Sequence, residues 1–136
     1  MSLSDGTTSI TLPDDLRWDD EFKWAPIAQT VNYGLTGALF VEEGAKQAGR
    51  PITLTAHDDM AWVDRETAQA LITMAAVTDK EMTLTITEAS TGEEDPGREI
   101  DVMFRRHDGE PIELEPVKGF GIDDDFIVRA IRLMEI

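Results

Sequence analysis

The stretch that decides the fold reads Leu35-Thr36-Gly37-Ala38-Leu39-Phe40-Val41, and it is followed after a loop by Ile52-Thr53-Leu54-Thr55-Ala56. In an extended chain, Leu35, Leu39 and Val41 share one face of the first segment. In the second segment the apolar side chains share one face and the two threonines share the other. This period of two predicts a β-hairpin between residues 35–41 and 52–56, joined by the glycine-bounded loop Glu43 to Pro51.

The same alternation recurs elsewhere in the chain. Further strands are predicted at residues 27–33, 82–86, 100–104, 112–114 and 126–136. The last of these is apolar on both faces, which indicates a central strand covered on both sides.

One helix is predicted after Asp64, a favourable N-cap residue that is followed by Glu66 in the first turn. Its apolar stripe would comprise Ala68, Leu71, Ile72, Ala75 and Ala76. The expected fold class is therefore mainly β with one helix (α+β), with antiparallel strands and the helix on a flank or end of the sheet.

The length of 136 residues and the apolar content of 41% predict a single domain over residues 1–136. Residues 1–8 are small and polar, and we expect them to form a flexible N-terminal tail. Residues 14–26 interleave aromatic rings with carboxylates. This segment is expected to be an arm or loop lying on another surface, the alternative being that its two tryptophans cap the domain's own core.

The formal net charge of −16 argues against attraction to nucleic acid or to anionic membranes. An acidic surface that keeps the protein in solution explains this charge, and so does a surface that repels or imitates nucleic acid. The chain has no cysteine, no signal peptide is expected at its start, and no apolar run approaches the length needed to cross a bilayer.

Catalytic chemistry is weakly represented, and we expect no enzyme. His57 and His107 are the two candidate general bases, and both are expected at solvated strand ends. The Gly44 to Gly49 loop lacks the spacing of a phosphate-binding loop, and the carboxylate clusters lack the spacing of a calcium loop. Neither a cofactor nor a bound metal is expected.

One region of the chain resembles a known family. The residues that carry the similarity are Trp24, Gln29, Tyr33, Leu35-Thr36-Gly37, Glu43-Gly44, Lys46 and Gly49-Arg50-Pro51-Ile52-Thr53-Leu54, followed by Trp62 and a short helix. The region is similar to small tail proteins of long-tailed bacteriophages and prophages. The resemblance covers about half of the chain and includes distal-tail (tail-tip and baseplate hub) and tail-tube proteins. It implies an antiparallel β-sandwich or barrel with a single flanking α-helix. It also implies a structural virion component, without catalytic residues, that forms a ring, usually of six subunits, around the DNA channel.

The resemblance implies three further expectations. The partners are other copies of the chain and other tail proteins, DNA passes through the ring without specific binding, and no membrane is involved. The expected locations are the virion tail and, during assembly, the host cytoplasm.

Candidate residues follow from this role. Subunit contacts are expected at Trp18, Phe22, Trp24, Lys46, Gln47 and Arg50, and lumen-facing acids at Glu42, Glu43, Glu113 and Glu115.

Two other classes of function remain open. An acidic inhibitor could imitate DNA and occupy a nucleic-acid-binding protein, although basic residues scattered among the acids weaken this hypothesis. A small hydrolase would require two carboxylates that converge in a cleft about 5 to 10 Å apart.

Overall fold

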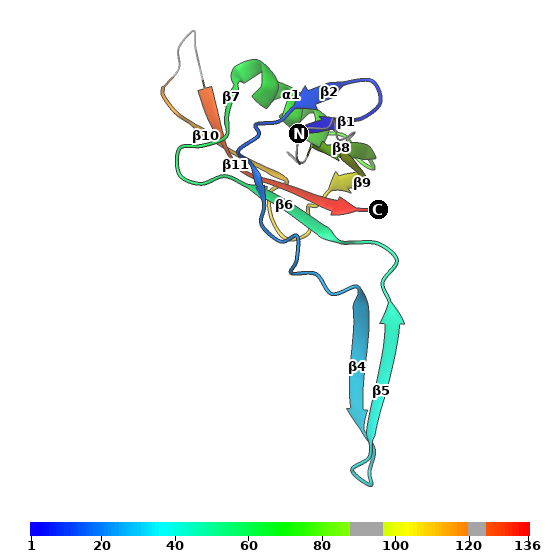
Figure 1. Cartoon of the computed structure of the whole chain (residues 1–136). Coiled ribbons are helices and arrows are strands. Elements are labelled where there is room, and N and C mark those ends of the chain that lie inside the picture. The colour runs from blue at the N-terminus through cyan, green and yellow to red at the C-terminus, as the bar shows by residue number, and fades with distance from the viewer. Residues whose placement is uncertain (88–96, 120–124) are drawn as a thin grey trace.

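The computed structural model describes residues 1–87, 97–119 and 125–136, which form a β-rich body and one long hairpin that projects from it (Figure 1). The predicted mainly antiparallel β fold with a single α-helix is confirmed for these residues. In chain order the elements are β1 (Ser2–Ser4), β2 (Ser9–Thr11), β3 (Arg17–Trp18), β4 (Ile27–Tyr33), β5 (Leu39–Ala45), β6 (Pro51–Thr55), β7 (Trp62–Asp64), α1 (Arg65–Ala75), β8 (Met82–Ile86), β9 (Arg98–Phe104), β10 (Ile112–Pro116) and β11 (Asp125–Glu135).

The body is one antiparallel sheet with the strand order β2-β1-β8-β9-β11-β6-β3. Strand β11 is its centre, as its two apolar faces predicted. Along one edge β11 pairs first with β10 and then with β9, and along the other edge it pairs first with β7 and then with β6. Both of its edges and most of its side chains are therefore covered.

Helix α1 begins where the sequence predicted. The Asp64 carboxylate accepts a hydrogen bond from the Thr67 backbone N–H at 2.8 Å. Hydrogen bonds from the Thr67 side chain and from its backbone lower the pKa of Asp64. The helix contacts β2, β7, β10 and β11, so the sheet bends around it. It buries Ala68, Leu71 and Met74, whereas Ile72 is half exposed. The predicted apolar stripe was therefore wrong at Ile72, which faces a surface groove instead of the core.

The core lies between this helix and the concave side of the sheet. Its fully buried large side chains come from five strands (β1, β6, β8, β9 and β11), from α1 and from the segment that follows β2. They are Leu3, Leu12, Ile52, Leu54, Leu71, Leu84, Val102, Val128, Ile131 and Leu133.

The predicted hairpin between residues 35–41 and 52–56 was wrong in its pairing. Residues 34–38 form a turn, in which Gly37 has a φ of 81°. The hairpin instead joins β4 to β5, and β6 pairs with β11 and β3. Alternation identifies the faces of a strand but not its partner, and the glycine-rich turn lay inside the segment that was read as a strand.

The prediction of a flexible tail at residues 1–8 was also wrong. Strand β1 lies between β2 and β8, and Leu3 is completely buried. Asp5 forms an ion pair with Lys80, which fixes the end of β1 to the loop before β8. Residues 14–26, which were predicted to be an arm or loop, are only partly irregular, because Arg17–Trp18 adds strand β3 to the edge of the sheet. Among the described residues, no helix is long and apolar enough to cross a membrane.

Candidate functional site

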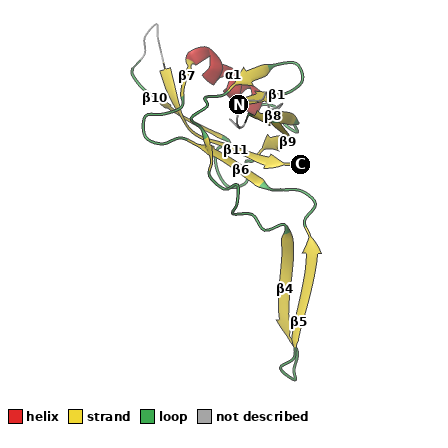
Figure 2. Ribbon diagram, viewed as in Figure 1, coloured by secondary structure: helices red, strands yellow, loops and turns green. Residues whose placement is uncertain are grey.

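The most distinctive surface is the hairpin of β4 and β5, here called the arm, which extends away from the body (Figure 2). The two strands pair in unbroken antiparallel register from Ile27↔Ala45 to Tyr33↔Leu39. Every residue of both strands is exposed. No other part of the described chain covers either face of the arm along its length.

Local chemistry explains the shape of the arm. Both strands contain β-branched and aromatic residues, which favour an extended backbone. At the tip, the Gly34 N–H donates to the Ala38 carbonyl at 2.8 Å and closes the turn. A Cβ at Gly34 would lie 2.9 Å from the ring of Phe40, so any other residue there would displace this exposed ring.

The arm presents one largely apolar face. Register places the cross-strand pairs Val31 and Val41, and Tyr33 and Leu39, on this face together with Ile27. Val31 and Val41 remain 47% and 48% exposed, and Tyr33 remains 75% exposed. Side chains of this kind rarely stay in water as a contiguous group unless a partner covers them.

Polar contacts hold the two strands together near the base of the arm. The Gln29 side-chain amide donates to the Glu43 carboxylate at 2.5 Å. The Lys46 ammonium lies 5.4 Å from the centre of the Trp24 ring, a cation–π contact that ties β5 to the segment before β4.

The base of the arm is fixed to the body through Trp18. The Arg50 and Arg98 guanidinium groups both lie over its ring, at 4.6 Å and 5.4 Å from the ring centre. Arg50 also donates to the Glu21 carbonyl at 2.5 Å. The segments that enter and leave the arm are therefore tied to each other and to β9.

A buried arginine, Arg105, also fixes the base of the arm to the body. Arg105 is only 7% exposed and donates to the Asp108 carboxylate and to the Thr53 hydroxyl, both at 2.9 Å. The Asp20 carboxylate, 3.8 Å from Arg105, accepts from the backbone N–H and the hydroxyl of Thr53. Asp20 and Arg105 thus hold the segment before β4 against β6.

The six predicted subunit-contact residues all lie near the base of the arm, but they differ in exposure and in the contacts that they make within the chain. Trp18 packs against the core, as the alternative for residues 14–26 predicted, and Arg50 is engaged with it. Phe22 is 92% exposed, and Gln47 is also exposed. The remaining two, Trp24 and Lys46, contact one another.

The four predicted lumen-facing acids fall into two separate regions. Glu42 and Glu43 lie on β5 of the arm, whereas Glu113 and Glu115 lie on β10 of the body (Figure 1). The two acids on β10 form ion pairs with Arg132 and Arg129 at 2.7 Å and 2.5 Å. The hydrogen bond from Arg129 lowers the pKa of Glu115. The structure does not bring these four acids together.

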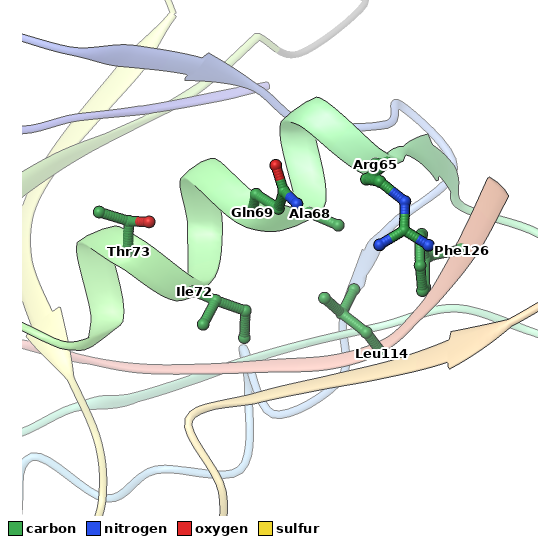
Figure 3. A pocket seen from close by; sticks show the side chains of 7 residues that line it. All are labelled: Arg65, Ala68, Gln69, Ile72, Thr73, Leu114 and Phe126. Atoms are coloured by element: carbon green, nitrogen blue, oxygen red, sulfur yellow. The ribbon is translucent and has the colours of Figure 1, made fainter. Parts of the chain in front are cut away.

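A shallow groove of about 410 Å³ lies between α1 and β10 (Figure 3). Ile72 and Leu114 face it from opposite sides, and the Arg65 guanidinium lies 5.2 Å from the centre of the Phe126 ring. The groove is mainly apolar, and none of the described residues that line it is one of the two carboxylates that a glycosidase needs.

Other candidate chemistry is dispersed over the surface. His57 and His107 are exposed in the turns between β6 and β7 and between β9 and β10. Within residues 1–87, 97–119 and 125–136, no three histidine or carboxylate side chains are grouped as metal ligands would be.

The exposed apolar residues of the arm were missed by sequence reasoning. The sequence assigned Val31 and Tyr33 to one strand and Leu39 to another, but it did not predict that these side chains stay exposed. A usable signal was the turn Gly34 to Ala38, which lies between two strand-forming segments of equal length and so favours a hairpin between them. Comparison with protein-family models, with curated protein sequences and with solved structures gives no match.

Proposed function

We propose that this chain is a structural subunit of a bacteriophage tail, a distal-tail or tube ring around the DNA channel, and that it assembles with copies of itself through the arm. The observation that carries the proposal is the arm itself, a hairpin whose apolar face no part of the described chain covers. Most residues on which the resemblance to tail proteins rests, from Trp24 to Lys46, lie in the arm or at its base.

Energetics support a role in assembly. An isolated two-stranded hairpin is marginally stable in water at best, because it buries too little apolar surface to offset the entropy of ordering its backbone. Here the base of the arm is fixed by Asp20, Arg105 and the contacts of Trp18, but the strands beyond it gain no packing from the body. Packing against another subunit would supply the missing burial.

The charge distribution fits the same role. Between Ile27 and Ala45 the only charged residues are Glu42 and Glu43, so nearly all of the net charge of −16 lies outside the arm. Acidic bodies repel one another and repel DNA, whereas nearly neutral arms can approach closely. A ring of such subunits would let DNA pass without binding it.

The alternative of a DNA mimic receives less support. A mimic requires carboxylates that stay unpaired in a continuous array. Several acids of the body are instead ion-paired, among them Glu113 with Arg132 and Glu115 with Arg129.

The mass of the full-length protein in solution tests the proposal. Light scattering over a concentration series, at low and high salt, should reveal a discrete oligomer that forms more readily at high salt, because salt screens the repulsion between acidic bodies. Negative-stain microscopy of that oligomer should show rings. Mass spectrometry of purified tails from the host that carries this gene should detect the chain.

Two results would contradict the proposal. The first is a protein that stays monomeric at all concentrations and is also missing from purified tails. The second is a monomer that displaces DNA from a DNA-binding protein, which would favour mimicry.

A further inference from the structure

We infer that the arms of neighbouring copies pair edge to edge, with β5 of one copy hydrogen-bonded antiparallel to β4 of the next, so that the arms together form one continuous β-sheet. This inference rests on the proposed function and specifies the surface through which the copies meet. The occupant of each free arm edge is a second copy of this chain.

The first observation is that both outer edges of the arm are open and unprotected. Natural edge strands are usually shielded by lysine, proline, a bulge or a covering segment. Residues 27–33 and 39–45 contain neither lysine nor proline, their register has no shift, and nothing in the described chain covers them. Such an edge is a template for another strand.

The second observation is the direction in which the backbone groups point. Hydrogen bonds at both ends of the arm join the Lys46 N–H to the Pro26 carbonyl and the Gly34 N–H to the Ala38 carbonyl. Because hydrogen-bonded pairs alternate with non-hydrogen-bonded pairs, the even-numbered residues of β4 are bonded within the hairpin. The N–H and C=O groups of the odd-numbered residues therefore point outward on both strands.

These outward groups match between β5 and β4. If Val41 of one copy lies opposite Val31 of the next, every outward group of one strand meets an outward group of the other. The same register keeps the apolar face continuous, because the residues of that face are the odd-numbered ones. It repeats between copies the side-chain pairs that already hold each hairpin together, including Tyr33 with Leu39.

Charge selects this pairing over a symmetric one between two β5 strands. Strand β4 carries no charge, whereas β5 carries Glu42 and Glu43. Two β5 strands side by side would bring like charges together. When β5 meets β4, Glu43 lies opposite the Gln29 amide of the next copy as well as that of its own, and a carboxylate can accept from both.

Closure of a ring favours pairing of β5 with β4 over pairing between two β4 strands. A symmetric β4 pair stops at two copies and leaves both β5 edges open. Head-to-tail pairing of β5 with β4 uses both edges of every arm, and a closed ring then leaves no free edge.

The absence of cysteine makes this arrangement directly testable by disulfide crosslinking in the full-length protein. In the inferred register, Thr30 of one copy and Glu42 of the next form a non-hydrogen-bonded pair, where side chains approach most closely. Thr30→Cys and Glu42→Cys are made in separate chains, because in one chain they would lie opposite each other within the hairpin. The two variants are mixed and oxidised mildly.

A heterodimer of the two variants should form about tenfold or more faster than the product of Thr30→Cys mixed with Thr78→Cys, an exposed position on the body that reports random collision. Circular dichroism and the urea midpoint establish that each variant is folded. Homodimers of Thr30→Cys alone would indicate a symmetric β4 pair, and homodimers of Glu42→Cys alone a symmetric β5 pair. Either result would overturn the inference.

The absence of a specific crosslink has two readings, which the mass of the unmodified protein separates. If that protein is an oligomer, the arms do not pair edge to edge, and only the further inference fails. If it is a monomer at every concentration and is missing from tails, the proposed function fails as well.

Discussion

The apolar face of the arm gives the sharpest quantitative prediction, through the double variant Val31→Thr, Val41→Thr. Threonine has nearly the shape of valine and an equally high preference for strands, so the arm should keep its conformation. Both valines are about half exposed in the single chain. What the substitution removes is therefore mainly the gain from covering the remaining half when copies assemble.

The size of the effect follows from these exposed fractions. Full burial of a valine side chain contributes about 1.5 to 2 kcal/mol, so covering the remaining half of each contributes about 0.8 kcal/mol. Burying each new hydroxyl without a hydrogen bond costs about 1 kcal/mol more. For two positions the loss is about 3.6 kcal/mol per arm, which weakens association by roughly 400-fold.

Light scattering or sedimentation over a concentration series measures this shift as the concentration at which half of the protein is assembled. The matched control is Ile72→Thr, because Ile72 is also β-branched and half exposed but lies on α1 of the body. Its midpoint should stay at the wild-type value. An unchanged midpoint for the arm variant, or an equal shift for Ile72→Thr, would refute assembly through the arm alone.

Three further predictions concern the body. Leu71→Ala should lower the free energy of unfolding by about 2 to 4 kcal/mol in urea, because this side chain is fully buried, whereas Ile72→Ala should change it far less. Arg105→Met should cost about 2 to 4 kcal/mol, because it leaves two carboxylates at the arm base without their cation. The hydrogen bond from Lys80 lowers the pKa of Asp5, so Asp5→Asn should lower the free energy of unfolding by its full amount at neutral pH. This difference from the wild type should shrink as the pH falls below about 4.

Each of these predictions has an outcome that contradicts it. Equal losses for Leu71→Ala and Ile72→Ala would mean that α1 does not pack as described. If Arg105→Met is as stable as the wild type, the contacts of Arg105 with Asp20 and Asp108 fix the conformation at the base of the arm without adding to the free energy of unfolding. A stability difference between the wild type and Asp5→Asn that grows toward acid pH would reverse the sign derived from the lowered pKa, since protonation of Asp5 removes the ion pair.

Some features of the fold could be read from local sequence. The threonine-alternating strand at residues 82–86, the N-cap at Asp64 and the central β11 were all predicted and found. These features depend on residues two to four positions apart, whose side-chain spacing and hydrogen bonds are decided within the segment itself.

The candidate site could be read only in part. The sequence indicated the region around Trp24 and Lys46, yet it did not predict that the apolar residues of the arm stay exposed. Whether an apolar face is buried depends on what lies against it, and a segment does not encode that by its own alternation. Ion pairs such as Glu113 with Arg132 were invisible for the same reason.

The sequence by itself determined which segments are extended, where the single helix starts, and that the surface is strongly acidic, because propensity, capping and charge are properties of neighbouring residues. Only the tertiary structure decided that β1 enters the sheet, that β6 pairs with β11, and that β4 and β5 stand apart from the core. Strand partners are selected by contacts between residues far apart in the chain, whose closure entropy must be offset by packing that exists only in the folded protein.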